Sequence, residues 1–253
     1  MPTVNHLTDR YANFLLPVLS PQEGVCEVCG TSVIGGWPRC FQCQDAWQRL
    51  KAVADVVDFV SLAVKGEQLA YELWKYKSRP GRAQSEIGLR LAALLWRWLM
   101  SHEECLLRAV ACADFPVVTT IPSGAGRPSE HPMEHMVNTV VPSTRDRYRT
   151  LLRADPNGPI GRVFNANRWI AEPLAGESVL VIDDTWTSGA HTQSAAAALK
   201  EAGAGTVAVL CIGRHFQRQP ADQRYQAAAE GYYKRAKQQG WDWNTCRLCW
   251  RAI

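Results

Sequence analysis

The chain has 253 residues, enough for one large domain or for a moderate domain with an appendage. Hydrophobic residues make up 47% and charged residues 21%, an ordinary globular mix that excludes a disordered or collagen-like chain. A net charge of +4 is too small to establish nucleic-acid binding by itself. The most apolar stretch, 89–100, is shorter than the ~20 residues of a membrane span, and no signal peptide is visible. We therefore expect a cytoplasmic protein with no membrane span.

The apolar pattern predicts strands and helices that alternate along the chain. It predicts one or two strands at 53–64, helices at 68–77 and 85–99, a strand at 116–122, a helix at 131–141 and a long loop at 142–162. A strand, a helix, a strand and a further helix follow at 177–182, 190–202, 206–212 and 214–240. Ser85 is the expected N-cap of its helix. A strand, helix and strand in succession imply a parallel sheet, so we expect an α/β fold.

Four of the nine cysteines form two close pairs near the start of the chain. Cys26-x-x-Cys29 is followed after ten residues by Cys40-x-x-Cys43. Two intervening residues let both thiolates of a pair reach one ion, and the second pair completes a tetrahedron. The spacing predicts a structural zinc site without an open position for water; a redox dithiol is the alternative.

A third pair, Cys246-x-x-Cys249, lies near the end of the chain among tryptophans. One pair does not close a tetrahedral site, so two interpretations stay open. The pair meets the N-terminal cysteines in space and binds metal, or it is an unliganded reduced pair beside an aromatic cluster. We interpret Cys105, Cys112 and Cys211 as small core residues.

The segment around Asp183 and Asp184 carries the main functional prediction. Residues 179–182 are apolar and suit a strand that is buried on both faces, and a run of small and hydroxylic residues follows the two carboxylates. Small residues let backbone N–H groups approach an anion, and a helix start adds about half a positive charge. The carboxylates accept hydrogen bonds from vicinal hydroxyls or attract Mg²⁺. These features describe a ribose 5-phosphate site; the alternative is an Asp-rich turn that caps a helix.

This order of residues resembles the signature of the type I phosphoribosyltransferases. The resemblance implies that Asp183 and Asp184 are catalytic and face the ribose hydroxyls of phosphoribosyl pyrophosphate (PRPP). It also implies that the following loop binds PRPP, through Thr185, Thr187, Ser188, Gly189, Ala190, His191 and Thr192. The family usually has Thr-Gly-x-Thr, whereas this chain has Ser188-Gly189-Ala190-His191. The missing hydroxyl comes from Thr192, or His191 supplies a nitrogen donor instead.

Three features together resemble the ComF (competence protein F, GntX-like) family: the four-cysteine finger, the Lys75-Tyr76-Lys77 segment and the PRPP loop. Weaker matches are Ile121-Pro122-Ser123 and Arg162-x-x-Asn165. The resemblance implies a five-stranded parallel sheet between helices, of type I phosphoribosyltransferase-like fold, fronted by a small N-terminal zinc finger. Arg127 is then a candidate pyrophosphate contact, and Lys75 and Lys77 are candidates to line the same ligand. Their alternatives are a solvated loop arginine and a solvated helix face.

We expect three parts: a segment with the finger at 1–50, the phosphoribosyltransferase-like domain at 51–215, and a helical Cys-Trp tail at 216–253. The expected function is transfer of a phosphoribosyl group to an unidentified base or amine with Mg²⁺. The alternative is a non-catalytic module of the same fold that binds nucleotide or single-stranded DNA in a competence-like role; a structural zinc adaptor is a third hypothesis. Candidate partners are PRPP or a related compound, single-stranded DNA, DNA-processing proteins and a second copy in a homodimer. No P-loop motif is present, which disfavours a motor ATPase.

Overall fold

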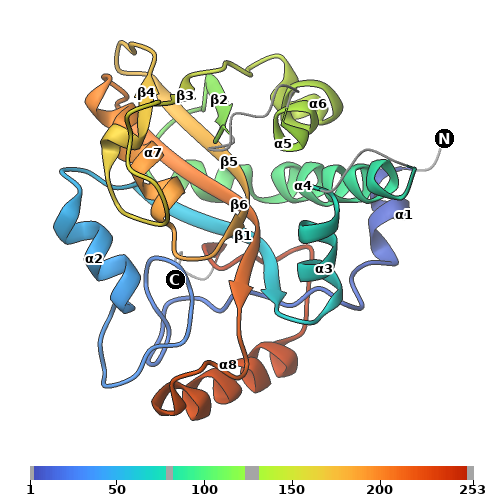
Figure 1. Ribbon diagram of the computed structural model, residues 1–253. Helices are drawn as coiled ribbons and strands as arrows, with labels where there is room; N and C mark the ends of the chain where they lie inside the picture. The colour runs from blue at the N-terminus through green and yellow to red at the C-terminus, as the bar shows by residue number, and fades with distance from the viewer. Residues whose placement is uncertain (1–2, 78–81, 123–130, 250–253) are drawn as a thin grey trace.

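A computed structural model describes residues 3–77, 82–122 and 131–249, and its centre is a parallel sheet between helices (Figure 1). Among these residues the sheet contains β1 (Val56–Val64), β2 (Val117–Thr120), β5 (Ser178–Trp186) and β6 (Thr206–Phe216). Their spatial order is β1-β6-β5-β2, and every neighbouring pair is parallel. The predicted α/β fold with a parallel sheet is confirmed, with four strands where the resemblance implied five. The specific phosphoribosyltransferase topology stays a prediction.

The described helices are α1 (Val4–Asp9), α2 (Phe41–Arg49), α3 (Gln68–Lys75), α4 (Arg82–Ala109), α5 (Pro132–His135), the π-helix η1 (Met136–Val140), α6 (Pro142–Arg145), α7 (Ala190–Glu201) and α8 (Gln226–Gln239), with short 3-10 turns η2 (Ala166–Arg168) and η3 (Gln223–Tyr225). No helix among the described residues combines the length and the apolar composition that a transmembrane span needs.

Three predictions of local structure are wrong. The helix expected at 214–240 begins only at Gln226, because β6 continues to Phe216. Helix α4 begins at Arg82, so Ser85 lies in its first turn and is not its N-cap. The range 142–162 is not one loop, because it contains α6 and β3 (Leu152–Ala154), which pairs antiparallel with β4 (Trp169–Ala171). Both segments are short, and their polar composition resembles that of a loop.

The sheet has a buried apolar layer on each face. Val179 and Val181 of β5 pack in the cluster that contains the α7 side chains, while Leu180 and Ile182 pack in the cluster that contains α4. Successive side chains of a strand point to opposite faces. The next two residues of β5, Asp183 and Asp184, therefore point to the α7 side and the α3/α4 side, respectively.

Both ends of the described chain contact the outer edge of β1. The backbone N–H of Leu62 donates to the Leu16 carbonyl oxygen at 2.8 Å, and the Ser61 hydroxyl donates to the same oxygen at 2.9 Å. The Arg247 guanidinium donates to the Val57 carbonyl oxygen at 2.7 Å. The backbone groups of this edge strand thus find partners in segments from opposite ends of the sequence.

Candidate functional site

A cavity of about 840 Å³ opens at the carboxyl ends of β1, β5 and β6, where open α/β sheets bind ligands. Its lining comes from Ala63, Lys65, Gly66, Ala70, Tyr71, Leu73, Trp74, Lys77, Ile121, Pro122, His131, Arg162, Asp183, Asp184, Thr185, Thr187, Ser188, Gly189, Ala190, His191, Thr192, His215 and Gln217. The structure thus brings the two predicted carboxylates and all seven loop residues that follow them to one cavity.

The loop reaches helix α7 through a glycine that no other residue can replace without strain. Gly189 has φ of +81° and is the N-cap of α7. A Cβ atom at this position would lie 2.2 Å from the ring of Trp186, which is buried. Ser188 Oγ accepts a hydrogen bond from the Ala190 N–H at 3.3 Å. The turn aims the positive end of a twelve-residue helix at the cavity.

We expect Gly189→Ala to lower stability by about 2–4 kcal/mol, because left-handed strain of about 1 kcal/mol adds to overlap with a packed ring. Urea unfolding measures the change. Gly88→Ala is the control, since Gly88 lies within α4 with open space around its Cβ position. That substitution should raise stability by about 0.5–1 kcal/mol. A Gly189→Ala protein as stable as the wild type would show that the turn relaxes without strain.

The two carboxylates have different environments. Asp184 is only 3% exposed, and it accepts a hydrogen bond from the Tyr76 hydroxyl. Both of its oxygens contact the Lys77 ammonium, at 2.7 and 2.8 Å. Asp183 accepts hydrogen bonds from the Asp184 N–H at 2.8 Å and from the Thr192 hydroxyl at 3.3 Å. Asp184 is therefore held by protein groups, whereas Asp183 is the carboxylate with a side open to the cavity.

Burial and then the charge of Asp184 raise the pKa of Asp183 from 3.8 to about 7. Between these pH values the folded state keeps a proton that the unfolded chain has lost, so this group makes stability fall as pH rises from about 4 to about 7. An asparagine side chain at this position can accept from the Asp184 N–H and donate to the Thr192 hydroxyl, and it does not titrate. We therefore expect Asp183→Asn to melt progressively higher than the wild type as pH rises through this window, measured by thermal unfolding at pH 4.5 to 8. If the melting temperatures of the two proteins differed by the same amount at every pH, the raised pKa of Asp183 would be contradicted.

Only one of the two predicted lysines lies at the cavity. Lys77 lines the cavity, whereas Lys75 does not. The Lys75 ammonium instead lies 6.0 Å from the centroid of the Trp74 ring. Helix α3 ends at Lys75, and Lys77 lies in the turn after the C-cap residue Tyr76, so the two lysines have different backbone settings. Arg127 lies outside the described residues. Lys65 and Arg162 add cationic side chains to the lining.

His191 and Thr192, where the loop departs from the phosphoribosyltransferase signature, have different surroundings. The Thr192 hydroxyl is buried and donates to Asp183. The His191 ring is half-buried, lines the cavity and lies edge-on to Trp169, with centroids 6.1 Å apart. Burial, and next the charge of Arg168, lower the pKa of His191, so at neutral pH one ring nitrogen donates and the other accepts.

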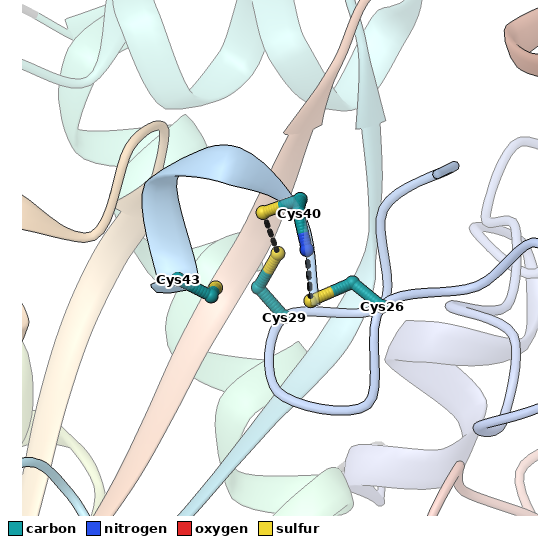
Figure 2. A group of neighbouring side chains, drawn as sticks. All are labelled: Cys26, Cys29, Cys40 and Cys43. Atoms are coloured by element: carbon teal, nitrogen blue, oxygen red, sulfur yellow. Dashed lines mark hydrogen bonds between the residues drawn. The ribbon is translucent and has the colours of Figure 1, made fainter. Parts of the chain in front are cut away.

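The four N-terminal cysteines converge on one point (Figure 2). All four sulfurs lie within 4.8 Å of one another, and Cys29 Sγ is 3.7 Å from Cys40 Sγ. Zn–S bonds of ~2.3 Å in a tetrahedron hold sulfurs ~3.8 Å apart. Cys40 is the N-cap of α2, and its N–H donates to Cys26 Sγ at 3.3 Å. The group could hold a structural metal ion such as zinc, with four protein ligands.

Buried Arg214 of β6 joins this cysteine group to the cavity loop. Its guanidinium donates to the Cys29 carbonyl oxygen at 2.9 Å and lies 3.2 Å from Cys29 Sγ. It also donates to the carbonyl oxygens of Trp186 and Thr187, both at 3.3 Å. The Arg214 guanidinium, whose positive charge faces the cysteine cluster, therefore also holds the backbone at the start of the cavity loop by hydrogen bonds.

Cys246 and Cys249 do not join the N-terminal cysteines. Their sulfurs are 3.4 Å apart, and they lie with His102 and Cys105 of α4 in a separate group. Neither predicted arrangement of this pair included α4.

Comparison of the chain with protein-family models, with curated proteins and with solved structures finds no match in any of the three. The site is therefore interpreted from its own chemistry.

Proposed function

We propose that the protein binds PRPP and transfers its phosphoribosyl group to a base or amine, with Mg²⁺ accompanying the pyrophosphate. One observation carries this proposal: a single cavity combines the N-terminus of α7, the carboxylate of Asp183 and the cationic side chains of Lys65, Lys77 and Arg162. A phosphate suits the helix N-terminus, a carboxylate suits vicinal hydroxyls, and the cations suit a pyrophosphate.

The proposed reaction needs no covalent nucleophile. Breaking the bond between the anomeric carbon and pyrophosphate gives an oxocarbenium-like ribose, and cations stabilise the leaving group. In this cavity Asp183 would accept hydrogen bonds from the sugar and stabilise its positive charge. Lys77 pairs with Asp184 but is about one-third exposed, so its ammonium can also meet a ligand anion.

Calorimetry with PRPP and Mg²⁺ at pH 8, above the pKa of Asp183, tests the proposal on the wild type, Asp183→Asn and Asp222→Asn. Loss of a charged acceptor from a bound hydroxyl costs ~1.5–3 kcal/mol, so Asp183→Asn should weaken binding roughly ten- to hundredfold. Asp222 pairs with Arg224 and is not among the cavity residues, which makes it the matched control. Equal affinity in all three proteins would contradict the proposal that Asp183 binds the ribose hydroxyls. Pyrophosphate release across a panel of bases then tests turnover.

A second candidate function is binding of nucleotide or single-stranded DNA without turnover. Tyr71 and Trp74 line the cavity, yet they are 52% and 67% exposed, and their rings lie 6.1 Å apart. Exposed aromatic rings beside cations are the usual platform for bases. Binding of an oligonucleotide whose log affinity falls steeply with log salt, without pyrophosphate release, would favour this candidate.

We further propose zinc as the ion of the Cys26, Cys29, Cys40 and Cys43 group, in a structural role. Four sulfur ligands leave no open coordination position. Together with the Lys75-Tyr76-Lys77 segment and the cavity loop, this group is the basis for proposing membership of the ComF family. Tyr76 and Lys77 of that segment both contact Asp184, so the motif and the acidic pair belong to one site.

A further inference from the structure

The last described segment of the chain, 241–249, returns from α8 to helix α4. There Cys246 and Cys249 meet His102 and Cys105, which lie one helical turn apart on α4. One ligand atom from each of these four residues lies within 4.8 Å of the other three. The described chain thus contains a second convergent group of soft ligands, which is distinct from the N-terminal cysteines and lies in the apolar layer on the opposite face of the sheet.

The distances within this group match a tetrahedral zinc site. Cys249 Sγ is 3.4 Å from Cys246 Sγ and 3.5 Å from Cys105 Sγ. The Nδ1 atom of His102 is 3.6 Å from Cys249 Sγ and 3.9 Å from Cys105 Sγ. Bonds of ~2.3 Å to sulfur and ~2.0 Å to nitrogen place tetrahedral ligands ~3.5–3.8 Å apart. A central ion would therefore need little movement of the ligands.

The histidine is oriented as a metal ligand. Its Nε2 lies 2.9 Å from the Trp243 carbonyl oxygen, which can only accept a hydrogen bond. The proton must then be on Nε2, which leaves the Nδ1 lone pair directed at the three thiols. A backbone carbonyl on the far ring nitrogen is the usual outer partner of a zinc-bound histidine.

Two nitrogen donors lie beside the sulfurs of this group. The Cys246 N–H donates to Cys249 Sγ at 3.3 Å, as the Cys40 N–H does to Cys26 Sγ in the N-terminal group. Arg108 Nη2 lies 3.7 Å from Cys105 Sγ. Three thiolates around Zn²⁺ leave one net negative charge, which a neighbouring guanidinium offsets.

We propose that His102, Cys105, Cys246 and Cys249 bind a second structural zinc ion, which fixes the C-terminal segment to α4. Four protein ligands leave no position for water or substrate, so this ion has no catalytic role. The residues fit zinc better than Mg²⁺ or Ca²⁺, which prefer oxygen ligands.

Arg247 connects the two cysteine groups. It lies between Cys246 and Cys249, and it is buried. Its guanidinium donates to the carbonyl oxygens of Glu27 and Val28, both at 2.9 Å, and these residues lie between Cys26 and Cys29. The second ion would thus hold a side chain that supports the backbone of the first site.

Zinc content by native mass spectrometry tests the proposal. We expect two zinc ions per chain in the wild type and one in both Cys105→Ser and Cys249→Ser. Cys112→Ser should keep two, because Cys112 contacts Ser178 and Thr206 and belongs to neither group. One ion in the wild type, still present in Cys249→Ser and lost in Cys26→Ser, would overturn the second site and leave the first intact.

A second measurement keeps the test decisive if the serine variants do not fold. Wild-type protein loaded with Co²⁺ should bind two ions, with thiolate charge-transfer bands from both. His102→Cys should still bind two ions, with a spectrum shifted toward that of two four-sulfur sites. Peptide mapping of the wild type without reduction should find no disulfide; a Cys246–Cys249 or Cys105–Cys249 disulfide in place of metal would refute the proposal.

Discussion

Cys29→Ser should lose the zinc ion proposed for the N-terminal cysteines and lower the melting temperature by about 10 °C or more. Structural zinc contributes on the order of 10 kcal/mol in isolated fingers, which is comparable with the net stability of a whole domain. The substitution also removes the sulfur that lies 3.2 Å from buried Arg214. The destabilisation therefore has two sources, an unfilled metal site and an uncompensated buried cation.

Metal analysis and calorimetric melting measure these effects. Cys112→Ser is the control, because Cys112 is half-buried and belongs to neither cysteine group. It should retain its metal and melt within a few degrees of the wild type. Unchanged zinc content and melting temperature in Cys29→Ser would show that the four sulfurs do not hold a stabilising ion.

Arg214→Met should destabilise the protein by about 3–5 kcal/mol and weaken the proposed binding of PRPP as well. The substitution leaves the carbonyl oxygens of Cys29, Trp186 and Thr187 without this donor in a buried environment, at about 1–3 kcal/mol for each group left unsatisfied. Thr187 begins the cavity loop, so its backbone loses a support that the proposed phosphate site needs.

Urea unfolding and calorimetry separate the two effects of Arg214→Met. Arg218→Met provides the comparison, because Arg218 is exposed and pairs with Glu230 at 3.2 Å. An exposed ion pair contributes about 0–1 kcal/mol, so this variant should differ little from the wild type in stability and in PRPP affinity. If Arg214→Met changed stability and PRPP affinity as little as Arg218→Met, the contacts of Arg214 with the cysteine group and the loop would contribute nothing measurable to either.

The features that could be predicted from the sequence are those that local pattern determines. The apolar run Val179–Ile182 predicts a strand buried on both faces, and the structure extends that strand through Asp183 and Asp184 to Trp186. The spacing of the first four cysteines predicts their convergence, because a ligand pair separated by two residues is a local motif.

The features that could not be predicted depend on contacts between distant segments. His102 and Cys105 show the helical spacing of a ligand pair, but the sequence does not indicate that Cys249, 147 residues after His102, packs against them. From the sequence alone Cys105 is expected to be a small core residue, because that is the usual place of a lone cysteine. Lys65 and His215 lie at the ends of β1 and β6, and the rule that ligands bind at the carboxyl ends of strands could have identified both.

The partners of β1 become available at very different times during synthesis. Leu16 precedes the strand, whereas Arg247 follows Val57 by 190 residues. Until residues 241–249 have left the ribosome, the Val57 end of this strand edge lacks the Arg247 donor, and an unpaired strand edge is a template for association with another chain. Part of this edge therefore stays exposed in the nascent protein even after β6 has emerged and paired with β1, and truncation near residue 245 should expose it permanently.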